Sequence, residues 1–218
     1  MKCKKDHCLY LKRWEVKGVK HILIVCVDVD DLTLAGSHPS SINDLKAKLS
    51  AKFTMRDLGE LYYLIKMEIK RDLERNTLNL SQQKYINDLL DKFQMRDCTP
   101  VPTPQAKRVI LRKEKTLTQE QIAARRLIKE GLVRGTRPDI ANAVRELSKY
   151  HSCYSKTHYR VAQRVLKYLK GTSKYGIHYN GNSTFKLEPY SDASFANAYK
   201  ERKSVTGYVS LLAGACIT

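Results

Sequence analysis

The segment Asp28-Val29-Asp30-Asp31 places three carboxylates within four residues, directly after an apolar run. Neighbouring acids repel one another at the tip of an apolar hairpin. A divalent cation relieves that repulsion, because Mg²⁺ and similar hard ions bind carboxylate oxygens. Pairs of such ions stabilise the attacking and leaving oxygens in phosphoryl-transfer reactions. An aspartate-rich surface turn is the alternative, since aspartate is common in turns, and the segment by itself favours that alternative.

The flanking residues predict the β-hairpin that would hold these acids. Residues 21–29 form a run of Ile, Leu and Val interrupted by one Cys and one Asp, which is typical of a buried strand. We expect Asp30 and Asp31 to form the turn and residues 32–35 to form the returning strand. The hairpin would therefore present the two adjacent acids at its tip.

The rest of the chain predicts further helices and strands. A helix capped by Ser40 or Ser41 would carry an apolar face at Ile42, Leu45, Leu49 and Phe53. Further helices are expected at residues 82–93, 118–130, 138–151 and 156–170, and strands at 61–70, 77–80, 176–179, 186–191 and 205–212. Pro100, Pro102 and Pro104 mark a linker, and Gly171 is expected to end the last helix in the left-handed conformation. This order predicts two α/β or α+β units joined by a helical segment.

The composition points to a polyanionic partner. Lys and Arg number 40 against 22 acids, giving a formal net charge of +18 among 218 residues. No segment has the length of a membrane span or the pattern of a signal peptide. We therefore expect nucleic acid, not a membrane, as the partner, and an intracellular location in the cytoplasm or nucleus. The six scattered cysteines predict unpaired thiols, not a zinc site.

A basic segment follows the predicted linker. Residues 155–180 contain six Lys and Arg residues and no acid. Arg160, Arg164 and Lys167 fall on one face of the predicted helix, with Lys170 one turn further on. Four tyrosines are interleaved with these cations: Tyr159, Tyr168, Tyr175 and Tyr179. Such a face suits phosphate neutralisation and stacking on exposed bases. A solvated helix face with tyrosines in the core is an equally good alternative.

Several motifs together resemble Ty1/copia-type retrotransposon reverse transcriptases. Residues 21–37 are similar to the palm hairpin of that family, in which a Tyr-x-Asp-Asp box carries two catalytic acids. The other matching motifs occur in the family's order: DLGEL (57–61), LIKMEI (64–69), LSQ (80–82), YI (85–86), LL (89–90), VPTP (101–104), GTRPDI (135–140), LKYLKGT (166–172), YSDA (190–193) and RKSVTGY (202–208). Each is weak alone, but together they cover nearly the whole chain.

The resemblance implies an α+β chain with three parts. Residues 1–80 would be the C-terminal part of a polymerase palm, residues 81–170 the thumb or connection helices, and residues 171–218 the first strands of a truncated ribonuclease H-like domain. The implied activity is RNA-directed DNA polymerase with ribonuclease H, copying RNA into DNA by two-metal nucleotidyl transfer. The implied partners are an RNA/DNA template–primer, deoxynucleotides and other chains encoded by the element.

The resemblance also assigns site residues. Asp30 and Asp31 match the metal-binding catalytic acids of the box, and Asp192 matches the first ribonuclease H acid. Lys66 lies where the family has the strand that grips the primer terminus. The implied cofactor is Mg²⁺ or Mn²⁺, and the basic helix would hold the template–primer duplex. Arg137 is expected to be structural, because Pro138 and Asp139 after it form a helix-entry signal.

The sequence departs from the family's pattern at several positions. Asp28 replaces the tyrosine of the box, and Lys66 replaces a glycine. The family's earlier palm aspartate and later ribonuclease H acids are expected to lie outside this chain, so we expect both metal sites to be incomplete and the chain to be inactive alone. Residues 122–134 lack the family's small and apolar residues. These departures are typical of a decayed or truncated copy of such an element.

Two other hypotheses compete with a polymerase and ribonuclease H fragment. The chain could be a non-catalytic nucleic-acid-binding protein, derived from a retroelement and kept for its basic surface. It could also be the product of a pseudogene with no stable fold, in which case its thermal unfolding would lack a cooperative transition.

Overall fold

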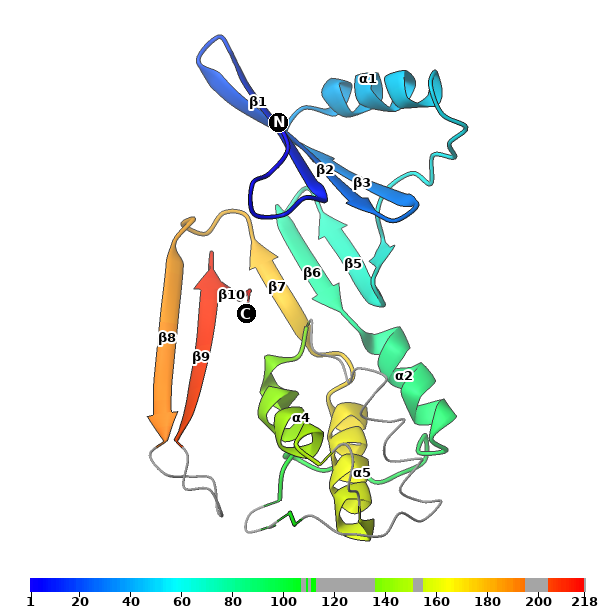
Figure 1. Ribbon diagram of the computed structural model, residues 1–218, viewed down its shortest axis with the longest axis vertical. Helices are drawn as coiled ribbons and strands as arrows, with labels where there is room; N and C mark the ends of the chain where they lie inside the picture. Colours follow the sequence, from blue (N-terminus) through cyan, green and yellow to red (C-terminus); the bar gives the residue numbers. More distant parts are fainter. Residues whose placement is uncertain (107–108, 110, 113–135, 151–154, 195–203, 218) are drawn as a thin grey trace. The chain divides into compact units, whose positions relative to one another are not determined.

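The computed structural model describes the chain except for residues 107–108, 110, 113–135, 151–154, 195–203 and 218. The helix predicted at 118–130 and the atypical segment 122–134 lie outside the described residues. The described part is α+β, with three small antiparallel sheets and four α-helices (Figure 1). None of these helices is long and apolar enough to cross a membrane. The chain divides into two compact units, residues 1–61 (unit 1) and 62–218 (unit 2).

Unit 1 contains a three-stranded sheet in the order β1-β2-β3. Its strands are β1 (Leu9–Val16), β2 (Val19–Asp28) and β3 (Asp31–Gly36). The predicted hairpin of β2 and β3 is confirmed, whereas β1 was not predicted. Lys17 and Gly18 join β1 to β2 with φ angles of 49° and 78°, the positive values that a two-residue hairpin turn requires. A Lys-Gly pair between alternating apolar residues was the signal for this strand.

Helix α1 (Pro39–Ser50) follows β3 and differs at both ends from the prediction. The helix begins at Pro39, whose fixed φ and missing N–H suit a first helical position, so the serines do not cap it. It ends at Ser50, so Phe53 lies outside the helix and is 61% exposed. Gly36 lies beneath α1, because a Cβ there would approach the side chains of Leu23 and Ile42 at 3.1 and 3.3 Å.

Unit 2 begins with a four-stranded sheet formed by segments far apart in the chain. Its order is β4 (Tyr63–Leu64), β5 (Met67–Asp72), β6 (Thr77–Ser81) and β7 (Gly176–Asn180). The predicted single strand at 61–70 is interrupted by a turn at Ile65 and Lys66, with φ angles of 48° and 62°. Strand β7 pairs with β6 across almost a hundred residues of sequence. A side chain at Gly176 would collide with the carbonyl oxygen of Leu80, so this pairing requires glycine.

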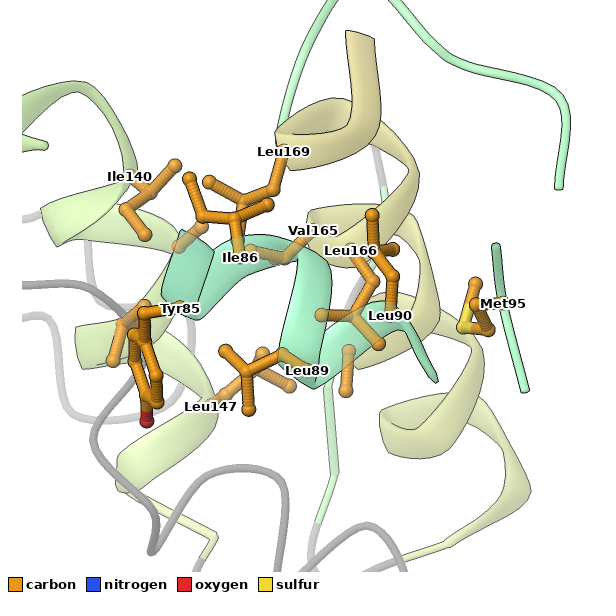
Figure 2. Close-up of a cluster of buried hydrophobic side chains, with 13 residues drawn as sticks. Tyr85, Ile86, Leu89, Leu90, Met95, Ile140, Leu147, Val165, Leu166 and Leu169 are labelled. Carbon is orange, nitrogen blue, oxygen red and sulfur yellow. The ribbon is translucent and has the colours of Figure 1, made fainter. Parts of the chain in front are cut away.

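Three helices form the core of unit 2. They are α2 (Gln83–Lys92), α4 (Ala141–Ser148), preceded by the 3₁₀ turn η1 (Pro138–Ile140), and α5 (Lys156–Gly171). Their facing sides supply most of one buried apolar cluster (Figure 2): Tyr85, Ile86, Leu89, Leu90, Met95, Ile140, Ala143, Val144, Leu147, Ala162, Val165, Leu166 and Leu169. A fully buried Leu or Ile stabilises the fold by about 1.5–3 kcal/mol. The helices predicted at 82–93 and 156–170 are confirmed, and the described part of 138–151 is helical to Ser148.

Gly171 has a different role from the one predicted. It is the last residue of α5 and does not adopt a positive φ, so it does not end the helix in the left-handed conformation. A Cβ at Gly171 would lie 3.0 Å from the Cβ of Pro100. The glycine therefore allows the proline-containing segment to pass close to the end of α5.

A third sheet lies at the C-terminal end of unit 2. It contains β8 (Leu187–Ser194), β9 (Val205–Leu212) and β10 (Ala215–Cys216), in the order β10-β9-β8. The strands predicted at 186–191 and 205–212 are thereby confirmed, the first extending three residues further. The Tyr179 hydroxyl of β7 donates a hydrogen bond of 3.2 Å to the carbonyl oxygen of Cys216. This bond connects the two sheets of unit 2.

Arg137 is almost completely buried, with 1% of its side chain exposed. Its guanidinium donates to both carboxylate oxygens of Asp139, at 3.0 and 2.8 Å, and to the carbonyl and hydroxyl oxygens of Thr172. The rings of Tyr168 and Tyr175 lie 5.5 and 5.6 Å from its central carbon. The guanidinium thus joins η1 to the end of α5, which confirms the structural role predicted for Arg137.

Burial alone would raise the pKa of Asp139. Hydrogen bonds from Arg137 and Tyr168, together with the guanidinium charge, outweigh burial and hold the pKa of Asp139 below its usual range. Burial of Tyr168 itself raises the pKa of its hydroxyl, and the hydrogen bond to the Asp139 carboxylate raises it further. The carboxylate therefore remains ionised beside the buried guanidinium.

We predict that Arg137→Ala lowers the free energy of unfolding by roughly 3–5 kcal/mol, because it leaves a partly buried carboxylate without its partner. Urea unfolding of the full chain measures the change. Arg145→Ala is the matched control, since the Arg145 side chain is 43% exposed and pairs with Glu146 on the surface of α4. The control should lower the free energy of unfolding by less than about 1 kcal/mol. Equal decreases in the free energy of unfolding of the two variants would contradict the role assigned to Arg137.

We predict that Ile65→Asn stabilises unit 2 by roughly 1 kcal/mol, because a β-branched residue is strained at positive φ and asparagine tolerates that conformation. Ile65 is 69% exposed, so little apolar burial is lost. Thermal unfolding of the full chain measures the effect. Leu73→Asn is the control, since Leu73 is 70% exposed and has no positive φ. An Ile65→Asn variant that unfolds earlier than the wild type would refute the strain argument.

Candidate catalytic hairpin and basic surface

The β2–β3 hairpin holds the three acids of the carboxylate segment. The register ends with Asp28 directly opposite Asp31, so Val29 and Asp30 form the two-residue turn. The prediction of a turn at Asp30 and Asp31 was therefore wrong by one residue, and Asp31 begins β3. Val29 is 89% exposed and has a φ of 52°, which is unusual for a β-branched residue. The strands thus present Asp28 and Asp31 as a like-charged cross-strand pair, with Asp30 at the tip.

These acids do not by themselves form a metal site. Asp28, Asp30 and Asp31 are all exposed to solvent. Within the described part of the chain, no three His, Cys, Asp or Glu side chains are grouped so that they could hold a metal ion. The hairpin therefore supplies two or three adjacent carboxylates and no further ligand from the described residues.

Lys66 lies in the turn between β4 and β5, not within a strand. Its φ of 62° is a value that glycine adopts without cost, so a glycine at this position would suit the turn. Its ammonium nitrogen lies 4.4 Å from the ring centroid of Tyr85 at the start of α2. This cation–π contact has no local sequence signal, because the two residues are nineteen positions apart and belong to different elements.

The four cations predicted to bind nucleic acid on α5 have different surroundings. Arg160 is exposed and Lys167 is partly exposed. Arg164 donates a hydrogen bond of 2.9 Å to the Thr103 hydroxyl, and Lys170 donates one of 2.8 Å to the Cys98 carbonyl oxygen. Two of the four cations therefore hold the proline-containing segment against α5. Among the described contacts, Arg160 and Lys167 form no hydrogen bond to the proline-containing segment.

The tyrosines near α5 are also divided between two roles. Tyr168 donates a hydrogen bond to Asp139, and Tyr159 packs partly buried against the apolar core. Tyr179 bonds to Cys216 in the neighbouring sheet. Tyr175 is 60% exposed beside Arg137. Most of these rings therefore contribute to packing, as one of the two sequence interpretations expected.

Asp192 lies within β8 and is exposed. It lies directly opposite Gly207 of the neighbouring strand β9. It lies two residues before the end of that strand at Ser194.

An aromatic group in unit 1 was missed by sequence analysis. The rings of Trp14 and His21 stack at a centroid distance of 5.4 Å and an interplanar angle of 24°. The ring of His38 meets His21 edge-on at 5.3 Å. Because β1 was not predicted, Trp14 was not expected opposite His21. The alternation of Tyr10, Trp14 and Val16 before a Lys-Gly turn was the available signal.

Comparison with known proteins gives a consistent result. Residues 2–107 match the family described as reverse transcriptase (RNA-dependent DNA polymerase). This range contains the β2–β3 hairpin and its three acids. No solved structure is significantly similar to the chain.

Individual relatives extend the similarity over the whole chain. A retrovirus-related Pol polyprotein from transposon TNT 1-94 of Nicotiana tabacum is 33% identical over all of this chain and 17% of its own length. The Pol polyprotein from transposon RE1 of Arabidopsis thaliana is 33% identical over 88% of this chain and 13% of its own. An uncharacterized mitochondrial protein of Arabidopsis thaliana is 30% identical over 84% of this chain and 76% of its own. The chain thus spans less than a fifth of these two Pol polyproteins.

We predict that Asp28→Asn raises the melting temperature slightly at low salt, because it removes one of two like charges that face each other across the hairpin. The gain should shrink at high salt, which screens exposed charges. Asp44→Asn is the control: Asp44 is an exposed acid on α1, so this change makes the same alteration in net charge. A lower melting temperature for Asp28→Asn than for the control would show that Asp28 and Asp31 do not repel each other measurably.

Proposed function

The chain belongs to the reverse transcriptase family of Ty1/copia-type retrotransposon Pol polyproteins, and on that premise we propose that it is part of an RNA-directed DNA polymerase. The observation that carries the proposal is the β2–β3 hairpin within the matched region, which carries Asp30 in its turn and Asp31 at the start of β3. Reverse transcriptases typically use divalent metal ions, and adjacent carboxylates are suitable ligands for Mg²⁺ or Mn²⁺.

In this proposal the three parts of the chain have separate roles. Residues 1–80 are the C-terminal part of the palm, residues 81–170 form the thumb or connection, and residues 171–218 begin a ribonuclease H-like domain with Asp192 as its first acid. The pairing of β6 with β7 then joins the palm segment to the segment that follows the thumb helices. Template–primer would contact the exposed Arg160 and the partly exposed Lys167 of α5, and the turn that carries Lys66.

We further propose that this polypeptide alone binds template–primer without extending it. The support is local: no metal-binding group of three side chains is assembled within the described residues. An acid also stands at position 28, where the resemblance implies a tyrosine. Chemistry would therefore require ligands from a longer Pol chain or from another chain encoded by the element.

The test combines binding and extension on the same labelled RNA/DNA template–primer. In a filter-binding assay, we expect the affinity of the chain for template–primer to fall steeply with salt, because each phosphate contact releases counterions. We expect no incorporation of deoxynucleotides with either Mg²⁺ or Mn²⁺. Incorporation that disappears in the Asp30→Asn/Asp31→Asn double variant would show that the chain is active alone. Absence of binding at low salt would refute any role in holding nucleic acid.

A second candidate is a non-catalytic nucleic-acid-binding protein derived from a retroelement. The observation that favours it is the net charge of +18, which does not depend on a complete metal site. The two candidates differ in substrate preference. A polymerase part should prefer a primer–template junction over the unprimed strand, whereas a general binding protein should hold both equally.

A further inference from the structure

In unit 1, the β1–β2 hairpin extends beyond the end of strand β3 (Figure 1). Strand β3 pairs with β2 only from Leu23 to Asp28, whereas residues 19–22 of β2 have β1 as their only strand partner. Residues 13–22 therefore form a two-stranded extension. Together with Lys12, which lies opposite Leu23 at the point where β3 begins to pair, they are called the outer ribbon. Because a two-stranded ribbon is only marginally stable by itself, the cross-strand pairs of the outer ribbon must contribute to holding it.

One face of the outer ribbon carries a row of rings. Lys12, Trp14 and Val16 alternate along β1 and so share this face with their β2 partners. Trp14 stacks on His21, and His38 meets His21 edge-on. The Lys12 ammonium lies 5.5 Å from the Trp14 ring centroid. Trp14 and His21 are partly exposed and His38 is exposed, so this row remains accessible to a ligand.

The outer ribbon is also strongly basic. Lys12, Arg13, Lys17 and Lys20 are all exposed, and Glu15 is its only acid. No ion pair to another described residue holds any of the four cations. At the tip, Val16 and Val19 lie opposite each other with 49% and 57% of their surfaces exposed. The outer ribbon thus combines accessible rings with unpaired positive charge.

We propose that the outer ribbon binds single-stranded nucleic acid. Bases would stack on the row of Trp14, His21 and His38, and phosphates would contact Lys12 and Lys17 beside it. The inference rests on the proposed function and specifies a surface for it that is separate from the acids of the β2–β3 turn. Strand β2 contributes to both, with His21 near one end and Asp28 at the other.

Single-stranded nucleic acid fits this surface better than other occupants. An anionic membrane would neutralise the cations, but it offers no planar group to stack on the rings. A second copy of the chain carries the same net charge of +18 and would be repelled. A single strand provides both the phosphates and the exposed base faces that the outer ribbon is equipped to contact.

The experiment uses Trp14, which is the only tryptophan in the chain. The full chain is titrated with oligothymidylate, and tryptophan fluorescence is followed together with the anisotropy of a labelled strand. Quenching of Trp14 should saturate at the same strand concentration as the anisotropy. The Lys12→Gln/Lys17→Gln variant should bind roughly tenfold more weakly, with a salt slope smaller by about 1.4, because each lost phosphate contact removes about 0.7 from the slope.

The matched control is Lys48→Gln/Lys52→Gln, which removes two exposed cations from the same unit, in and just after α1. This variant should retain the wild-type affinity and slope. Binding without quenching, with equal affinities for the two double variants, would overturn the outer-ribbon proposal and leave the proposed function standing. Absence of binding to both oligothymidylate and template–primer at low salt would refute both.

Two further outcomes would overturn the proposal in favour of another occupant. Quenching of Trp14 by phosphatidylserine–phosphatidylcholine vesicles, but not by oligothymidylate, would assign the outer ribbon to a membrane surface. A change in Trp14 fluorescence with protein concentration alone would assign it to contact between copies. Sedimentation at the same concentrations measures the second outcome independently.

Discussion

The buried guanidinium of Arg137 is the constraint on which the helical part of unit 2 depends. An ionised group with 1% exposure is tolerated only when its donors are satisfied, and here Asp139 and Thr172 accept all the hydrogen bonds that are formed. Those partners belong to η1 and to the residue after α5. The helices must therefore meet at one relative position, where Ile140 and Leu169 also join the apolar cluster. Next to Arg137, Thr136 is buried and bonds to Gln82 at the start of α2, which brings the third helix to the same point.

The sheet of unit 1 is stabilised differently from the helical core of unit 2. Only Leu23 among its described apolar residues is as buried as the core of unit 2, so backbone pairing and partial burial stabilise the sheet. The like-charged pair of Asp28 and Asp31 and the strained Val29 both work against that stability. Strain and repulsion of this kind are typical of a functional turn. Membership of the reverse transcriptase family gives a reason for acids at this position, since adjacent carboxylates suit divalent cations.

The positive charge of the chain serves two purposes. Arg164 and Lys170 on α5 hold the segment around Thr103 and Cys98, and Arg137 is enclosed in the core. The exposed cations of the outer ribbon form no such contacts. The number of cations available to bind phosphate is therefore smaller than the net charge of +18 suggests, because some of the cations stabilise the fold. Hydrogen bonds to protein oxygens, and burial in the case of Arg137, distinguish the structural cations from the exposed ones.

Local periodicity and the order of the motifs were sufficient to predict the family, the β2–β3 hairpin, the strongly amphipathic helices α2 and α5 and the structural role of Arg137. These signals placed the turn one residue late and missed β1, because Lys12, Arg13 and Glu15 interrupt the apolar alternation of that strand. The pairing of β7 with β6, the approach of Gly171 to Pro100 and the position of Trp14 opposite His21 became known from the folded chain. Each of these is a contact between elements, and no local propensity encodes the partner that a strand edge or a ring will meet.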